Sequence, residues 1–202
     1  MRVVVRRAGA GLHRTSFGEE ARRDEGLPAV RETHPEPLRD VPGLRRLRRE
    51  EALREAGEGA ILSGVNAVGN SGVVISLNCE TDFVAKNGDF VGVAQTLLDL
   101  ALSEGVASKE ELLTKTFPGS SLTVADKITE EVGKIGERIE IGDMRVVSGD
   151  KVVAYIHPGN RLATAVAFAG EVSDEVGRDV AMQAAAMAPV AVDETSIPDD
   201  LI

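Results

Sequence analysis

Cysteine is nearly absent from this sequence, since Cys79 is the only one among 202 residues. A single cysteine excludes an internal disulfide and cannot form a cysteine-based zinc site on its own. The three histidines, His13, His34 and His157, are scattered without the spacing of metal ligands. We therefore expect the protein to hold no metal ion and no cofactor.

Aromatic residues are also scarce, at 3% of the sequence with no tryptophan, so the core must consist of valine, alanine, leucine and isoleucine. Proteins that bind single-stranded nucleic acids stack bases on flat aromatic rings. The formal net charge of −10 is opposite in sign to the charge that displaces counterions from phosphates. We expect no direct binding to nucleic acid, and a protein partner suits this acidic chain better.

Long apolar runs and enzyme signatures are missing as well. No stretch approaches the roughly 20 apolar residues of a membrane span, and none resembles a signal peptide. We therefore expect no membrane association and a cytoplasmic location. The sequence has neither a phosphate-binding loop nor a glycine-rich dinucleotide fingerprint nor an H-E-x-x-H motif. A composition of 43% hydrophobic and 28% charged residues is ordinary for a globular protein.

The first 56 residues differ in composition from the rest. All their basic residues are arginine, and the first lysine is Lys86. Four prolines between residues 28 and 42 interrupt any helix, so only residues 44–56 are expected to be helical. We interpret this segment as a charge-laced helix after a disordered stretch. An RNA-binding arginine arm is less favoured, because acidic residues nearly cancel the charge.

Regular patterns begin at residue 57. Residues 72–78 form a β-branched run typical of a strand, and residues 89–105 have apolar positions at helical spacing that end at Gly105. Ser173 or Asp174 can cap a last helix, which stops at Pro189. The sequence predicts further helices at 109–115 and 124–134, the last helix at 174–187, and strands at 138–147, 151–157 and 161–170. Three strands joined by short turns predict an antiparallel meander in a fold of the α+β class.

Cys79 and His157 could form a nucleophile and base, which would make the protein a small hydrolase or thiol enzyme. A lone cysteine at the end of a strand is far more often a small buried hydrophobe. His157 directly precedes the turn sequence PGN, where a partly exposed side chain is ordinary. We therefore favour a structural interpretation of both residues and expect no enzymatic activity.

One segment, NCETDFVAKN at residues 78–87, combines a carboxylate with a large ring in a loop between a strand and a helix. The structural interpretation is that Phe83 and Val84 tuck under the following helix, while Glu80 and Asp82 face water. The functional interpretation is a protruding anchor, because an aromatic ring beside a charge suits a small interface hot spot. The residues alone leave both interpretations open.

This segment resembles the signature of the elongation factor Ts family, Asn-Cys-(Glu/Gln)-Thr-Asp-Phe-Val-Ala. Three more segments resemble family motifs and follow in the family's order. They are KIGERI at residues 134–139, YIHPGNRLATAVAF at 155–168 and DVAMQAAAMAPVAV at 179–192. The chain is similar to the family over residues 57–202, and the sequence AYIHPGNRLAT is most similar to the bacterial branch of the family.

The resemblance implies a guanine-nucleotide exchange factor for elongation factor Tu that binds the GDP-bound and nucleotide-free forms. The family inserts a loop, here Thr81, Asp82, Phe83 and Val84, beside the Mg²⁺-binding region of that partner. Loss of Mg²⁺ coordination then promotes GDP release. Ile135 and His157 match further partner-contacting positions. The implied fold has two small subdomains of antiparallel strands packed with helices, and it needs no cofactor of its own.

Both ends depart from the family pattern. Residues 1–56 do not match the family's ubiquitin-associated-like helical module, and we expect them to be irregular or helical, either disordered or the product of a shifted reading frame. Residues 57–140 are expected to form the first core subdomain and residues 141–202 a second, truncated one. A degenerate member that acts only as a binding module is the alternative function.

Overall fold

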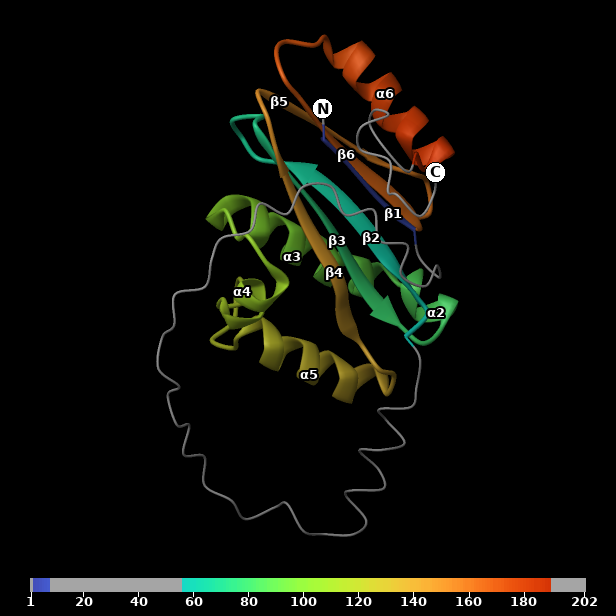
Figure 1. The fold of residues 1–202 in the computed structure, drawn as a ribbon. Coiled ribbons are helices and arrows are strands. Elements are labelled where there is room, and N and C mark those ends of the chain that lie inside the picture. Colours follow the sequence, from blue (N-terminus) through green and yellow to red (C-terminus); the bar gives the residue numbers. More distant parts are fainter. Residues whose placement is uncertain (1, 8–55, 190–202) are drawn as a thin grey trace, which may run out of the picture.

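Two antiparallel three-stranded sheets form the centre of the protein, which a computed structural model describes for residues 2–7 and 56–189 (Figure 1). The first sheet has the order β2-β3-β4, with β2 at Glu58–Val65, β3 at Ser71–Cys79 and β4 at Glu140–Ser148. The second has the order β1-β6-β5, with β1 at Arg2–Arg7, β5 at Lys151–Ile156 and β6 at Leu162–Phe168. Sheets packed with helices confirm the predicted α+β class.

Five helices connect or cover these strands in the described part of the chain. They are α2 at Asp82–Ala85, α3 at Gly88–Glu104, α4 at Lys109–Thr114, α5 at Val124–Ile135 and α6 at Asp174–Met187. A polar side chain caps the N-terminus of each long helix, and α3 and α5 end at glycines in the left-handed region, Gly105 and Gly136. The four longer helices confirm the sequence prediction, and Ser173 is the cap of α6.

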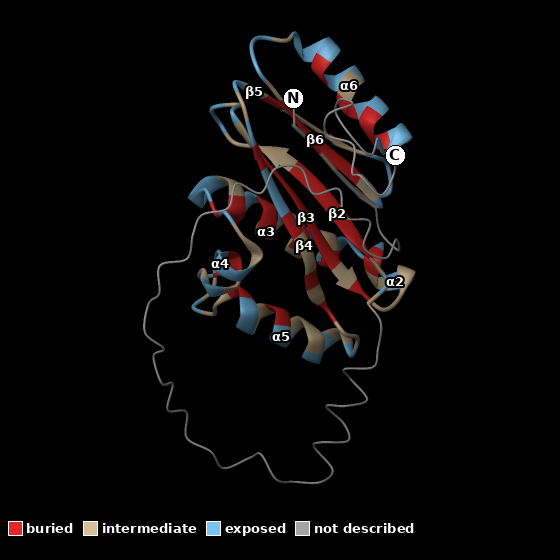
Figure 2. Ribbon diagram, in the orientation of Figure 1, coloured by how far each residue is buried: buried red, intermediate tan, exposed pale blue. Residues whose placement is uncertain are grey.

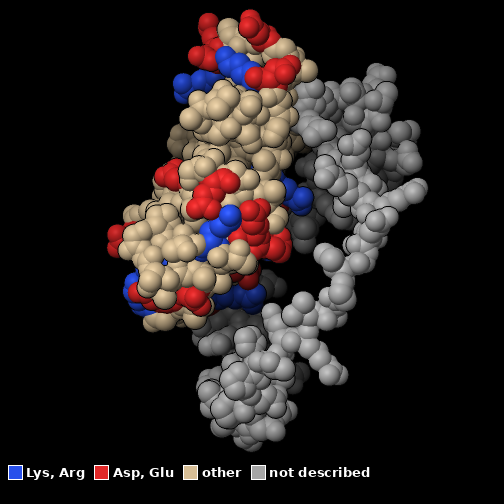
Figure 3. Space-filling model, turned by 90° about the vertical axis from the view of Figure 1, so that its left-hand side faces the viewer, with Lys and Arg blue, Asp and Glu red and all other residues tan. Residues whose placement is uncertain are grey.

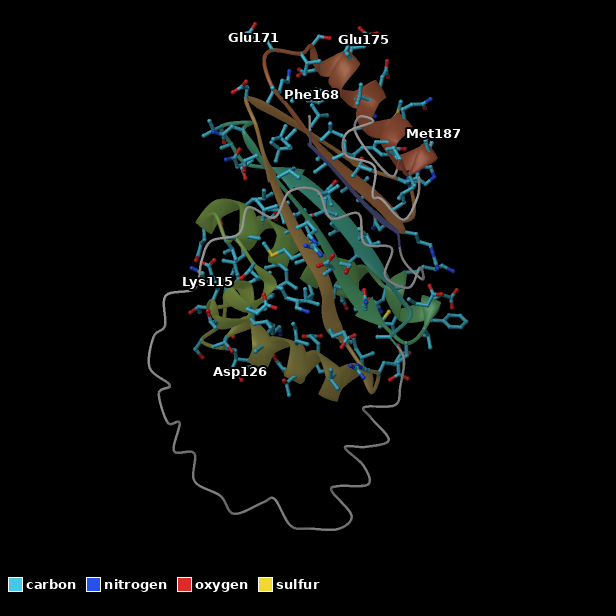
Figure 4. The ribbon with its side chains drawn as sticks, viewed as in Figure 1. Lys115, Asp126, Phe168, Glu171, Glu175 and Met187 are labelled. Carbon is cyan, nitrogen blue, oxygen red and sulfur yellow. The ribbon has the colours of Figure 1, made fainter. Side chains whose placement is uncertain are left out.

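The sheets and helices stack as four layers (Figures 1 and 2). Helices α3, α4 and α5 cover one face of the β2-β3-β4 sheet, and the other face packs on the β1-β6-β5 sheet. Helix α6 covers the outer face of that second sheet, where Val166 and Ala181 are fully buried. Figure 4 shows α6 extending from Glu175 at one end to Met187 at the other, with Phe168 on the strand beneath.

Burial on both faces explains why the central strands read as continuous apolar runs. In β2, Ile61 faces the second sheet whereas Leu62 faces the helices, and β3 alternates in the same way at Val74 and Ile75. Strand β6 presents a row of alanines to the first sheet: Ala163, Ala165 and Ala167. Because these side chains are small, the two sheets pack closely over that row.

The predicted meander of three consecutive strands is wrong, because β4 pairs with β3 and not with β5. The chain changes sheets in the turn after β4. There Gly149 donates its backbone N–H to the Asn70 oxygen at 3.0 Å, and Val152 donates to the Gly69 oxygen at 2.7 Å. Space is tight at this crossing, since a Cβ on Gly149 would lie 2.7 Å from the Phe168 oxygen. The turn therefore directs β5 into the second sheet.

The N-terminal residues also differ from the prediction. We expected an irregular or helical segment, but Arg2–Arg7 form β1, which pairs antiparallel with β6 and buries Val3 against α6. The sequence did not predict this strand, because it has only six residues and pairs with β6, which lies far along the chain. Strand β2 was not predicted either. All but the last residue of the helix expected at residues 44–56 lies outside the described residues, as do His13, His34 and residues 190–202.

Candidate protein-binding site

The signature segment forms a one-turn helix, α2, between β3 and α3, where the sequence predicted a loop. Thr81 is its N-cap: its backbone is extended, with φ −119° and ψ 153°, and its side chain accepts a hydrogen bond from the Val84 nitrogen at 3.4 Å. Strand β3 ends at Cys79, so the turn begins directly at the end of the sheet's central strand. Thr81, Asp82, Phe83 and Val84 therefore share one turn.

The Phe83 ring points away from the protein and is 84% exposed. Val84 is half-buried against the core that lies under α3, and Ala85 is buried. The structural interpretation, in which Phe83 tucks under the next helix, is therefore wrong for Phe83 and holds for Val84. An exposed ring of this size contributes little to the protein's own core and is available for contact with a partner.

Asp82 lies beside Phe83 and forms an ion pair with Lys86, with 2.7 Å between Oδ2 and Nζ. The hydrogen bond and charge of Lys86 hold the pKa of the Asp82 carboxyl below its usual range, and the Arg161 charge acts in the same direction. Asp82 is consequently ionised at neutral pH. The turn thus presents one carboxylate and one apolar ring side by side.

Glu137 connects the KIGERI segment to this turn. Its carboxylate accepts a hydrogen bond from the Thr81 nitrogen at 3.1 Å and another from the Thr81 hydroxyl at 2.6 Å. In the adjacent pair, the Arg138 nitrogen donates to Glu80 Oε1 at 2.7 Å. The KIGERI motif contains Glu137, but the sequence alone did not predict a role for this residue. Ile135, at the end of α5, is half-buried and lines a shallow apolar depression with Phe90 and Val93.

His157 is exposed in the turn between β5 and β6, and its Nδ1 lies 3.0 Å from the Tyr155 hydroxyl. That turn is attached to the edge of the first sheet. The Ile61 nitrogen donates to the Asn160 oxygen at 2.7 Å, and Arg161 pairs with Glu58 at 2.6 Å. Glu58 is also the register partner of Cys79, at the strand end from which the turn starts. The structure therefore joins His157 to the other site residues only indirectly.

Cys79 and His157 do not form the nucleophile and base that the sequence left open. The Cys79 thiol is buried and donates to the Thr81 oxygen at 3.2 Å, whereas the imidazole pairs with Tyr155. Burial raises the pKa of the thiol to about 11, with the Glu137 charge acting in the same direction. A nucleophilic cysteine needs the thiolate, so this thiol is a structural residue.

Within residues 2–7 and 56–189, no group of three or more histidine, cysteine, aspartate or glutamate side chains could hold a metal ion. None of the described helices is long and apolar enough to cross a membrane. On the face shown in Figure 3, the described basic and acidic atoms are interspersed and form no large surface of one sign. Among the described residues, the α2 turn with Phe83 and Asp82 is the candidate site for binding another protein.

Comparison with known proteins identifies the family. The family model described as "Elongation factor TS" matches residues 80–202, so the match begins at the start of the turn. The chain is 44% identical over 155 residues to "Elongation factor Ts" of Christiangramia forsetii, covering 76% of this chain and 55% of that protein. It is 46% identical over 151 residues to the protein of that name from Flavobacterium psychrophilum, covering 74% and 54%.

A third relative, "Elongation factor Ts" of Porphyromonas gingivalis, is 45% identical over 139 residues, covering 69% of this chain and 50% of that protein. The chain belongs to the elongation factor Ts family. It spans about half the length of the curated relatives it matches.

Proposed function

We propose that this protein is a guanine-nucleotide exchange factor for elongation factor Tu and that α2 is the element that acts on the partner. The observation that carries the proposal is the 84% exposure of Phe83 on a turn whose cap, Thr81, bonds to Glu137 and whose last residue, Ala85, is buried. The membership in a family of translation elongation factors supports the choice of partner. We assign the activity to the cytoplasm, where translation elongation takes place.

In the proposed mechanism, Phe83 inserts between elements of the partner next to its Mg²⁺-binding region, and Asp82 forms a polar contact beside it. Displacing the partner's Mg²⁺ exposes the diphosphate charge that the ion neutralises, and this weakens GDP binding. By linkage, a factor that binds the nucleotide-free partner more tightly than the GDP complex favours nucleotide loss to the same extent. Ile135 and His157 supply further contacts in this proposal.

The energy required is within the reach of a small hot spot. A thousandfold loss of nucleotide affinity corresponds to about 4 kcal/mol. Truncation of one buried interface aromatic typically costs about 2–4 kcal/mol. Such a factor acts by binding alone, so we propose that it is not an enzyme and uses no cofactor, metal or nucleic acid of its own.

The test is release of a fluorescent GDP from purified elongation factor Tu, with and without this protein. We expect acceleration by the unmodified protein and a loss of roughly 30- to 1,000-fold in exchange efficiency for Phe83→Ala. Val68→Ala is the matched control, because Val68 is 78% exposed in the turn at the opposite end of the β2–β3 hairpin. Equal activity of Phe83→Ala and Val68→Ala would contradict the proposed role of α2.

The alternative is a binding module that holds elongation factor Tu without exchanging its nucleotide. Direct measurement of complex formation, made beside the release assay, separates the two functions. Binding without acceleration of release supports the module, whereas acceleration supports the exchange factor.

A further inference from the structure

We propose that Glu137 is a positioning residue that fixes the α2 turn, so that Phe83 and Asp82 are held in the geometry required for exchange. This inference rests on the proposed function for its consequence in the exchange assay. Its structural part concerns only the free protein and can be tested without elongation factor Tu.

The geometry is a pair of reciprocal contacts between two segments that are distant in sequence. The Glu137 carboxylate accepts from the Thr81 nitrogen at 3.1 Å and from the Thr81 hydroxyl at 2.6 Å. In return, the Glu80 carboxylate accepts from the Arg138 nitrogen at 2.7 Å. Each segment therefore contributes one carboxylate and one backbone N–H. Hydrogen bonds to an ionised acceptor are stronger than neutral ones, so this arrangement is well suited to hold one conformation.

The turn needs such an anchor because α2 has only four residues. Isolated helices shorter than about 12 residues are marginal in water, since nucleation costs more than a few backbone hydrogen bonds return. Burial helps at the end of the turn, where Ala85 is 9% exposed, but the exposed Phe83 ring adds nothing to the core. At its start the turn depends on Thr81, whose nitrogen and hydroxyl both bond to Glu137.

The contact also links α2 to α5. Glu137 follows Gly136, which ends α5 in the left-handed region with φ 78°, and Ile135 lies at the last position of that helix. The contact therefore holds Phe83 in place relative to α5 as well as to the end of β3. A contact that served only as a helix cap would involve Thr81 and Val84 alone.

The first experiment uses the free protein. The sequence has no tryptophan, so a Phe83→Trp variant provides a single tryptophan at the exposed position. We expect Glu137→Ala in this background to lower the tryptophan fluorescence anisotropy, because a released turn reorients within the excited-state lifetime, while far-UV circular dichroism stays unchanged. Glu130→Ala is the matched control, because Glu130 is an ion-paired carboxylate on α5 that bonds to Lys127 and Lys134. Equal anisotropy in the Glu137→Ala and Glu130→Ala variants overturns the proposal.

The second experiment measures GDP release from elongation factor Tu. We expect Glu137→Ala to lower the exchange efficiency by roughly tenfold to a hundredfold, with Glu137→Gln intermediate, because an amide oxygen accepts more weakly than a carboxylate. Thr81→Val, which removes the hydroxyl that donates to Glu137, should lower exchange by a similar factor. Combining Glu137→Ala with Phe83→Ala should add little to the loss caused by Phe83→Ala, since both act through the same ring.

The outcomes separate the two proposals. If the unmodified protein does not accelerate GDP release, the proposed function fails, and the anisotropy measurement still decides whether Glu137 fixes the turn. If the unmodified protein is active and Glu137→Ala exchanges normally, the positioning role is overturned while the proposed function stands. Full additivity of Glu137→Ala and Phe83→Ala would likewise contradict action through Phe83.

Discussion

Helices α2 and α3 lie next to each other in the chain and use the same amino acid in opposite ways. Phe83 on α2 is 84% exposed, whereas Phe90 on α3 is 2% exposed. Helix α3 has 17 residues, six of which are buried, and Phe90 belongs to that apolar face. Helix α2 has four residues and buries only Ala85. The length of an element and its anchoring, and not the residue type, determine which phenylalanine stabilises the fold and which one is available to a partner.

Replacement of Phe90 by alanine should have the largest effect on stability. We expect a decrease of about 3–5 kcal/mol in the free energy of unfolding, because a fully buried aromatic leaves a cavity under α3. Urea unfolding followed by circular dichroism measures the change. A loss below about 1 kcal/mol would show that the buried Phe90 ring stabilises the fold little more than the exposed Phe83 ring does.

The Cys79 thiol is buried where β3 meets α2, and its reactivity tests whether solvent reaches that region. A pKa raised from 9.0 to about 11 means about a hundredfold less thiolate at pH 8, so reaction with a disulfide reagent should be at least that much slower than in denaturant. The stability from the neutral thiol is complete below pH 9 and is lost as the pH rises towards about 11. Rapid labelling of the folded protein would contradict this closure.

The junction between α2 and α3 should be of intermediate importance. The Asn87 side chain caps α3 by accepting from the Asp89 nitrogen at 2.8 Å. We expect Asn87→Ala to lower the free energy of unfolding by about 1 kcal/mol and Asn87→Asp to leave it nearly unchanged, since aspartate is an equally good cap. Thermal unfolding of the two variants in parallel measures the difference. An equal loss in both would show that the side-chain cap is not what Asn87 contributes.

Replacement of Phe83 by alanine should have the smallest effect on stability. We expect a change within about 0.5 kcal/mol, because an exposed ring has little to lose on unfolding. The same unfolding assay that detects Phe90→Ala checks this value. A loss comparable to that of Phe90→Ala would mean that the ring packs on the protein in solution and is not free to bind.

Local patterns predicted the elements that bury a periodic face. Helix α3 was predicted from its apolar spacing and its terminal Gly105, and α6 from Ser173 and Pro189. Helix α2 was not predicted, since four residues cannot display a period. The path of β4 was predicted wrongly, because alternation shows that a segment is a strand without showing which strand it pairs with.

The candidate site was predicted in part. The pairing of a ring and a carboxylate at Phe83 and Asp82 was visible in the sequence, but whether the ring was buried or exposed was left open. The role of Glu137 could not be predicted from spacing, since its partner Thr81 lies 56 positions earlier in the chain. Long-range hydrogen bonds of this kind depend on the tertiary fold.

The pairing of β1 with β6 has a consequence for how the chain acquires its structure during translation. Residues 2–7 leave the ribosome well before their hydrogen-bonding partners at residues 162–168 have been made. At about 5–20 residues per second, the interval is roughly ten to thirty seconds. Throughout that time β1 is an unpaired strand that another nascent chain could capture. Strand β1 therefore cannot enter its sheet until β6 has been made, and the fold cannot cover it before then.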